Sequence, residues 1–181
     1  MIRRLKNDVL QDLPTKRRQN IPVELDAKAL KELQANLYAL QSAGRGFDFN
    51  VLWSKLALQT AEAKKGIAAE YVLDLVEGGC KLLVFAHYLS VLDHLEQQLT
   101  RSKVPHIRID GSVSALDRAA AVARFQTDDS VRVAVLSLKA AGQGITLTAA
   151  TTVVFAELDV VPGALLQVLS LLALLVQRYK Y

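Results

Sequence analysis

The stretch VRVAVLSLKAAGQGITLTAATTVVFAE, residues 131–157, decides how this chain folds. It holds two short apolar runs, at 131–137 and 152–156, separated by a turn that contains two glycines. Runs that are apolar at nearly every position, rather than at alternate positions, are typical of strands buried on both faces of a parallel sheet. Neighbouring parallel strands need crossover connections, so helices are expected between the strands.

The sequence before this stretch supplies the expected alternation of strands and helices. Ser112 or Ser114 is suited to cap a helix that follows the second strand. The alternation predicts an α/β fold, with a parallel sheet flanked by helices. The strands are predicted at 81–86, 106–110, 131–137 and 152–156, and the helices at 89–101, 114–125 and 163–176.

Residues 1–79 differ from this pattern and form a helical segment that precedes a domain at 80–181. Leucines recur at helical spacing in AKALKELQANLYAL, and Asp26 stands immediately before that run. Gly78 and Gly79 are placed to end the last helix of the segment. The helices predicted here are 27–40, 51–64 and 67–76.

Composition restricts the class of protein. A chain of 181 residues, 51% hydrophobic and 22% charged, can bury one globular core. Residues 1–18 account for the net charge of +4, and such a surplus suits a phosphate backbone but is also common in proteins that bind no nucleic acid. The lone Cys80 excludes an intrachain disulfide and a cysteine metal cluster. The apolar run 164–176 is shorter than the roughly 20 residues that span a bilayer, and neither a membrane span nor a secretory signal is expected.

The turn AAGQGITLTAA, residues 140–150, is a candidate phosphate-binding loop. Gly142 and Gly144 flank Gln143 at the end of a predicted strand. Glycines at such a place let the backbone approach a phosphate closely. An ordinary tight turn is the alternative, because the segment is neither a Walker A loop nor a dinucleotide fingerprint.

Two more strand ends carry polar residues. His87 follows the strand at 81–86, and Ser112 follows the strand at 106–110. Open α/β sheets bind ligands at the carboxyl ends of their strands, which makes both residues candidates for a binding site. The alternatives are a turn histidine with a local partner and ordinary helix capping. The three scattered histidines do not indicate a metal site.

Together with LLVFAH (82–87) and IRIDGSVSALDR (107–118), the stretch 131–157 resembles the second, RecA-like motor lobe of Swi/Snf-like DNA-dependent ATPases. The resemblance is closest to the annealing-helicase, or fork-remodelling, branch and implies that residues 1–79 link and brace two lobes. It implies DNA contacts for one set of residues and a place at the nucleotide cleft for another. The DNA set is His87, Ser112, Lys139 and Thr146, and the cleft set is Gly142, Gln143, Gly144 and Gln167.

In the intact family motor the cofactors are ATP and magnesium, the partner is DNA, and the location is nuclear in a eukaryote and cytoplasmic otherwise. After about residue 163 the chain departs from the family, because the arginine-finger positions fall on Leu171 and Leu174. The helix 164–176 is apolar on all sides and must be buried or paired. It either docks a protein partner, folds in a rearranged way, or is a corrupted end.

Three functional hypotheses follow from this pattern. The first is the second lobe of a DNA translocase that anneals strands or regresses forks, without ATP hydrolysis or a bound cofactor in this chain alone. The sequence holds no Gly-Lys-Ser/Thr loop and no Asp-Glu box, which the family carries on the N-terminal lobe. The second is a catalytically inactive module that docks DNA or protein. The third is a fragment with no role of its own.

Overall fold

The computed structural model describes residues 19–42, 47–141 and 147–157, and the remaining residues are left out of the description below. The four strands and the helices Ala27–Ser42, Leu89–Arg101 and Ala115–Thr127 follow one another in the order predicted, and a short helix that was not predicted, Leu138–Ala141, precedes the last strand. The last predicted helix, 163–176, lies outside the described residues. The described elements are α2 (Ala27–Ser42), α3 (Phe47–Glu77), β1 (Leu82–Ala86), α4 (Leu89–Arg101), β2 (His106–Ile109), α5 (Ala115–Thr127), β3 (Val133–Ser137), α6 (Leu138–Ala141) and β4 (Thr152–Phe155).

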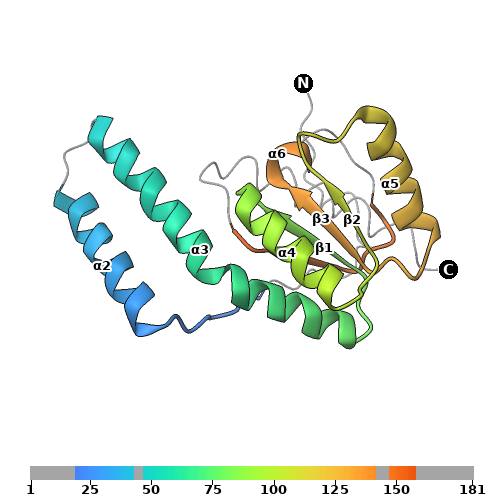
Figure 1. The fold of residues 1–181 in the computed structure, drawn as a ribbon, viewed down its shortest axis with the longest axis horizontal. Helices are drawn as coiled ribbons and strands as arrows, with labels where there is room; N and C mark the ends of the chain where they lie inside the picture. The colour runs from blue at the N-terminus through green and yellow to red at the C-terminus, as the bar shows by residue number, and fades with distance from the viewer. Residues whose placement is uncertain (1–18, 43–46, 142–146, 158–181) are drawn as a thin grey trace, which may run out of the picture.

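The four strands form one parallel sheet in the order β2-β3-β1-β4, which confirms the predicted α/β class (Figure 1). β1 and β3 lie at the centre, and all five residues of each are buried. β4 forms one edge among the described strands and is only partly buried. The apolar runs of β1 and β3 are therefore those of strands covered on both faces, whereas the equally apolar run of β4, expected to be buried, is only partly covered by the described residues.

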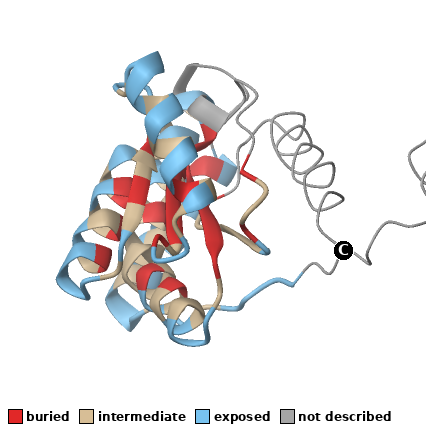
Figure 2. Ribbon diagram, turned by 90° about the vertical axis from the view of Figure 1, so that its right-hand side faces the viewer, coloured by how far each residue is buried: buried red, intermediate tan, exposed pale blue. Residues whose placement is uncertain are grey.

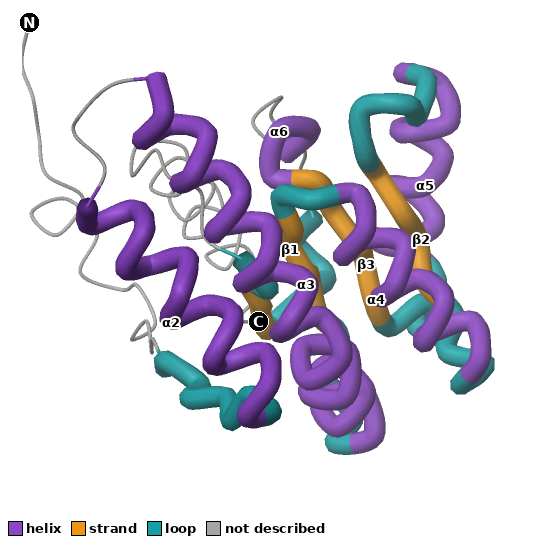
Figure 3. Tube along the Cα trace, turned by 60° about the vertical axis from the view of Figure 1, so that its left-hand side comes forward, coloured by secondary structure: helices purple, strands orange, loops and turns teal. Residues whose placement is uncertain are grey.

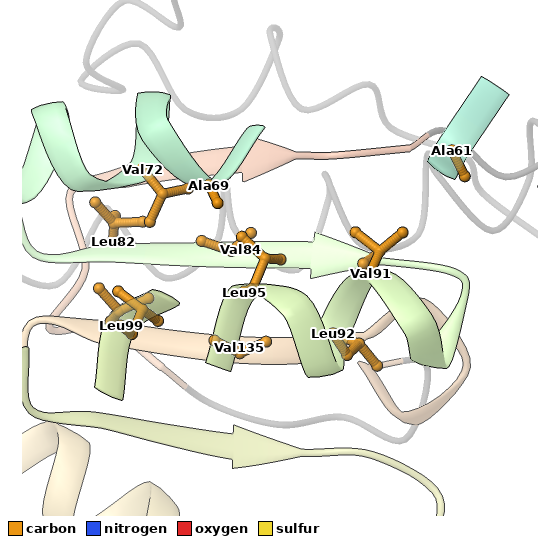
Figure 4. Close-up of a cluster of buried hydrophobic side chains, with 12 residues drawn as sticks. Ala61, Ala69, Val72, Leu82, Val84, Val91, Leu92, Leu95, Leu99 and Val135 are labelled. Atoms are coloured by element: carbon orange, nitrogen blue, oxygen red, sulfur yellow. The ribbon is translucent and has the colours of Figure 1, made fainter. Parts of the chain in front are cut away.

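Helices cover the two faces of the sheet. Because successive side chains of a strand point to opposite faces, Leu82 and Val84 belong to one cluster, and Leu83 and Phe85 to another. The first cluster packs beneath α3 and α4, and the second beneath α5 and the segment that leads to β4 (Figure 2). Figure 4 shows the first cluster, in which the side chains of α3, α4 and the strands meet.

The helix α4 shows why its sequence produces this packing. Its four buried residues, Val91, Leu92, Leu95 and Leu99, recur at intervals of one, three and four, which places them on one face of a helix. Its opposite face carries the charged and polar residues. The bounds predicted for this helix, 89–101, are confirmed.

The prediction of two helices at 51–64 and 67–76 is wrong, because α3 is a single helix of 31 residues. Gly66, at the expected break, costs a helix only about 1 kcal/mol relative to alanine. Packing on both sides of it offsets that cost, since Ala61 and Ala69 are both buried in the same cluster. The predicted end is confirmed: Gly79 has a φ of +82°, which glycine adopts without strain, and Cys80 N–H donates to Leu75 O at 3.0 Å.

The length of α3 makes it project beyond the sheet. A helix of 31 residues is about 46 Å long, whereas a five-residue strand spans about 16 Å. Its N-terminal half lies beside α2, and the two form a helical hairpin (Figures 1 and 3). Asn36 Nδ2 donates to Gln59 Oε1 at 2.7 Å and joins the two helices. Among the described helices, none is both long enough and apolar enough to cross a membrane.

The predicted leucine stripe of α2 is only partly covered. Leu40 is buried, but Leu30 and Leu37 are 46% and 44% exposed. Asp26 Oδ1 accepts a hydrogen bond from Ala29 N–H at 2.7 Å and begins the helix as its sequence indicates. The domain boundary near residue 79 stays a prediction, and the C-terminal half of α3 packs on the sheet that follows it.

Candidate functional site

The carboxyl ends of the four strands meet along one edge of the sheet, because all the strands are parallel. His87 follows β1, Ser112 follows β2 and Lys139 follows β3. Three of the predicted DNA-contacting residues therefore lie along a common edge, which we call the carboxyl edge. Both Ser112 and Lys139 are exposed there, and His87 is half-buried.

At the carboxyl edge, the buried acid Glu157, which stands two residues after β4, holds the turn that follows β1. Glu157 is only 6% exposed, and its Oε2 accepts hydrogen bonds from the backbone N–H groups of His87 at 2.5 Å and Tyr88 at 3.4 Å. The His87 and Tyr88 rings meet edge to face at 4.9 Å. Burial, and then the negative charge of Glu157, raise the pKa of the Tyr88 phenol above its ordinary value.

A second buried acid holds the turn that follows β2. Asp110 Oδ1 accepts hydrogen bonds from Ser112 N–H at 2.9 Å and from Ser112 Oγ at 2.6 Å. These two bonds lower the pKa of the Asp110 carboxyl below its ordinary value, and pairing with Arg108 lowers it further against the opposing effect of burial. The Ser112 hydroxyl thus donates inward and keeps its oxygen lone pairs as acceptors.

Arg108 connects this turn to the neighbouring helix. Its Nε donates to Asp110 Oδ2 at 2.8 Å, and its Nη1 donates to Asp93 Oδ1 at 2.7 Å and Glu96 Oε2 at 2.6 Å. Burial opposes the charge of the guanidinium, but hydrogen bonds to Glu96, Asp93 and Asp110 outweigh that effect and raise the Arg108 pKa. Strand β2 is therefore linked to α4 by the Arg108 guanidinium, a group that stays positively charged.

The structure shows which of the two candidate serines, Ser112 or Ser114, caps helix α5. Ser114 Oγ accepts from Asp117 N–H at 3.1 Å and donates to Asp117 Oδ2 at 2.7 Å, so Ser114 is the cap. Ser112 does not cap the helix. Its side chain belongs to the Asp110 turn instead, which corrects the reading of Ser112 as an ordinary capping residue.

A buried cation lies at the opposite, amino edge of the sheet. Lys81 is 7% exposed, and its Nζ donates to Asp128 O at 3.0 Å and lies 3.6 Å from Asp129 Oδ1. The same ammonium lies 4.9 Å from the centre of the Phe125 ring. Lys81 joins the start of β1 to the loop before β3, so its place in the fold is structural.

Several predicted positions fall outside the described residues, and their assignments stay predictions. They are Thr146 of the DNA set, Gly142, Gln143, Gly144 and Gln167 of the nucleotide cleft, Leu171 and Leu174 at the arginine-finger positions, and the apolar segment 164–176.

The acidic side chains of the carboxyl edge are engaged by groups of the protein itself. Within the described residues, no group of three or more His, Cys, Asp or Glu side chains is arranged to hold a metal ion. The acids of the carboxyl edge are occupied by backbone N–H groups, a hydroxyl and a guanidinium. Those contacts fit a positioning role for the acids and do not fit magnesium coordination.

Sequence reasoning missed Glu157, Asp110, Arg108 and Lys81. The two acids carry a signal that was available, since each stands directly after an apolar strand, at the carboxyl edge of a parallel sheet. The sequence contains no comparable signal for the two cations, because Arg108 alternates with apolar residues like any edge-strand residue and Lys81 stands at the start of a strand. Their partners lie on other elements and come close only after folding.

Comparison with known proteins gives the family. The family described as "Helicase conserved C-terminal domain" matches residues 64–178, and the chain belongs to that family. Within it, the chain resembles the Swi/Snf-like annealing helicases. It is 45% identical over 174 residues to the mouse protein named "DNA annealing helicase and endonuclease ZRANB3", a match that covers 92% of this chain and 16% of the relative.

A frog relative gives the same result. The chain is 44% identical over 172 residues to a protein of Xenopus tropicalis, "SWI/SNF-related matrix-associated actin-dependent regulator of chromatin subfamily A-like protein 1", covering 92% of this chain and 18% of the relative. The chain thus spans less than a fifth of the length of these two relatives. The solved Sulfolobus solfataricus SWI2/SNF2 ATPase C-terminal domain shares the fold, with a TM-score of 0.58 and 20% identity over 74% of this chain and 68% of that one.

Proposed function

We propose that this chain is the second motor lobe of a DNA-dependent ATPase that anneals or remodels DNA, and that its carboxyl edge contacts the DNA backbone. The observation that carries the proposal is the convergence of His87, Ser112 and Lys139 on one edge of the sheet from three different strands. The names of the relatives, which describe DNA annealing helicases, support the same direction.

The mode of binding follows from the chemistry of this edge. An exposed lysine and an imidazole can donate to phosphate oxygens, whereas the Ser112 hydroxyl must first leave Asp110 to do so. Such contacts position a protein on DNA without reading its sequence. We therefore expect little sequence preference and a steep loss of affinity as salt rises. In a eukaryote, such a motor acts in the nucleus.

Hydrolysis of ATP is a separate part of the proposal. A motor of this type binds ATP and magnesium between two lobes, and the phosphate loop and the acidic residues that hold magnesium belong to the other lobe. The chain alone is therefore expected to bind DNA without turning over ATP. Turnover by the pure chain that exceeds a matched blank contradicts this part.

The experiment is a titration of fluorescent branched DNA with the purified chain across a salt series, without ATP. Charge reversal in Lys139→Glu is expected to weaken DNA binding. It is also expected to make the plot of log affinity against log salt concentration less steep, by the equivalent of about one to two phosphate contacts. Lys103→Glu is the matched control, because Lys103 is exposed in the turn that precedes β2, at the amino edge. Equal losses in the two variants contradict a contact at the carboxyl edge and leave only general charge attraction.

An absence of saturable binding by a folded, monomeric sample contradicts DNA binding by this lobe. Binding that is saturable but indifferent to Lys139→Glu and His87→Ala contradicts the assignment of the edge. These two outcomes separate failure of the function from failure of the site.

A further inference from the structure

Glu157 is a residue of the carboxyl edge whose contacts the proposed function does not use. It lies two residues after the end of β4 and reaches across to the turn after the neighbouring strand β1. Its Oε2 accepts from His87 N–H at 2.5 Å and from Tyr88 N–H at 3.4 Å, whereas its buried Oε1 has no hydrogen-bond partner among the described residues. Among the described residues, no lysine, arginine or histidine forms an ion pair with it.

A buried carboxylate that lacks a cation is costly, so its presence needs a reason. The N–H groups of His87 and Tyr88 supply it. They lie where β1 ends and α4 begins, and Tyr88, the residue that caps α4, provides no side-chain hydrogen bond to the helix. The carboxylate of a distant residue accepts from the two N–H groups that immediately precede the helix, and its negative charge suits the start of a helix.

Other contacts also hold the Tyr88 side of this turn, because Tyr88 packs against the cluster beneath α3 and α4 and its C=O accepts from Val91 N–H at 3.1 Å and Leu92 N–H at 3.2 Å. The His87 ring meets the Tyr88 ring edge to face, and its buried Nδ1 has no hydrogen-bond partner among the described residues. On the sheet side, Ala156 N–H donates to Phe85 O at 2.9 Å, and the Phe85 and Phe155 rings stack at 5.2 Å, so β4 itself is held firmly against β1. Glu157 thus transmits the position of β4 to the backbone that carries His87.

We propose that Glu157 is the positioning residue of the DNA-binding edge: its carboxylate fixes the His87–Tyr88 turn so that the His87 side chain meets the DNA backbone. This inference rests on the proposed function. It makes a prediction of opposite sign to simple electrostatics, because removing an acid from a surface that meets phosphates raises affinity when only charge matters.

The test compares Glu157→Ala, Glu157→Gln and His87→Ala by two measurements on the intact chain. The first is affinity for the fluorescent branched DNA at fixed salt. The second is hydrogen exchange of the His87 and Tyr88 amides without DNA. Glu157→Ala is expected to speed amide exchange and to weaken DNA binding by roughly three- to tenfold, since a hydrogen bond to a charged acceptor is lost. Glu157→Gln keeps an acceptor oxygen and is expected to rescue most of both losses.

Two controls separate positioning from loss of the fold. Lys81→Met removes a buried group at the amino edge and is expected to lower stability while leaving DNA affinity per folded molecule unchanged. In the His87→Ala background, Glu157→Ala is expected to add little further loss of affinity, because its effect acts through His87.

The outcomes are distinguishable. A higher affinity in Glu157→Ala, or additive losses in the double variant, overturns the inference while the proposed function stands. Unchanged amide exchange in Glu157→Ala also overturns the inference, whatever effect the substitution has on DNA affinity. If His87→Ala binds DNA as well as the unsubstituted chain, the assignment of His87 in the proposed function fails, and the positioning role for DNA fails with it.

Discussion

The two edges of the sheet handle buried charge in opposite ways. At the amino edge, Lys81 is surrounded by a carbonyl, an aspartate and an aromatic face, and every one of these contacts stays within the fold. At the carboxyl edge, Glu157 and Asp110 hold two turns whose outer residues, His87 and Ser112, are left partly or fully exposed. The difference teaches that a buried charge can serve the core alone or can position residues that face outward.

The largest expected effect tests the amino edge. Lys81→Glu places a carboxylate beside Asp129 and the Asp128 carbonyl, and is expected to cost about 3–5 kcal/mol in the free energy of unfolding. Urea denaturation measures this loss. Lys103→Glu, a charge reversal at an exposed position, is the control and is expected to change stability by no more than about 0.5 kcal/mol. Similar losses in both variants contradict a specific role for the buried cation.

A smaller effect is expected when the carboxyl edge loses the Arg108 guanidinium. Arg108→Leu places an apolar side chain on β2 and leaves Asp110 with only the Ser112 hydrogen bonds. It is expected to lower the free energy of unfolding by about 2 kcal/mol. Thermal and urea denaturation at neutral pH measure the loss. A second variant, Arg108→Lys, keeps the charge without the planar fork and is expected to recover only part of it. Full recovery shows that charge alone suffices.

The pH dependence sharpens the comparison at Asp110. Because its pKa is lower in the folded chain than the ordinary value of 3.8, the unfolded state binds the proton more readily at acid pH. Its stabilising contribution is fully present above about pH 4 and is lost as the pH falls through the folded-state pKa. Asp110→Asn is expected to flatten the fall in stability below pH 4. A fall as steep as that of the unsubstituted chain assigns the acid sensitivity to other carboxyls.

The smallest effect lies away from both edges. Gly66→Ala is expected to stabilise the chain by about 0.5–1 kcal/mol, because a Cβ at that position meets nothing within 4 Å and alanine favours the helix. Urea denaturation measures the gain. A loss of stability contradicts the continuous helix α3 and supports the break that the sequence suggested.

Sequence reasoning succeeded where a local pattern controls the structure. The apolar runs predicted the strands, and the bounds predicted for α4, 89–101, are those that the structure shows. It failed at Gly66, because the packing that keeps α3 continuous comes from the sheet and α4, which are distant in the sequence. It left Ser112 and Ser114 both open as the cap of α5, and the folded turn decides for Ser114 because the Ser112 hydroxyl bonds Asp110 instead.

The candidate site divides in the same way. His87 and Ser112 were proposed because each follows a predicted strand, and Lys139 was proposed from the resemblance to the motor lobe. Parallel pairing brings all three positions to one edge. Glu157 was missed, because its role depends on the contact between β4 and β1, two strands separated by some 65 residues of chain. No propensity or motif in either segment records that pairing.

The sequence by itself determined the α/β class, the order of the strands, and the strand ends where the candidate binding residues lie. Hydrophobic periodicity and turn residues act within a few neighbouring residues, so a linear reading contains them. The tertiary structure decided that β1 lies between β3 and β4, that α3 runs unbroken, and that buried charges hold three of the turns. Those outcomes depend on which surfaces exclude water together, and that is a property of the packed chain rather than of any one segment.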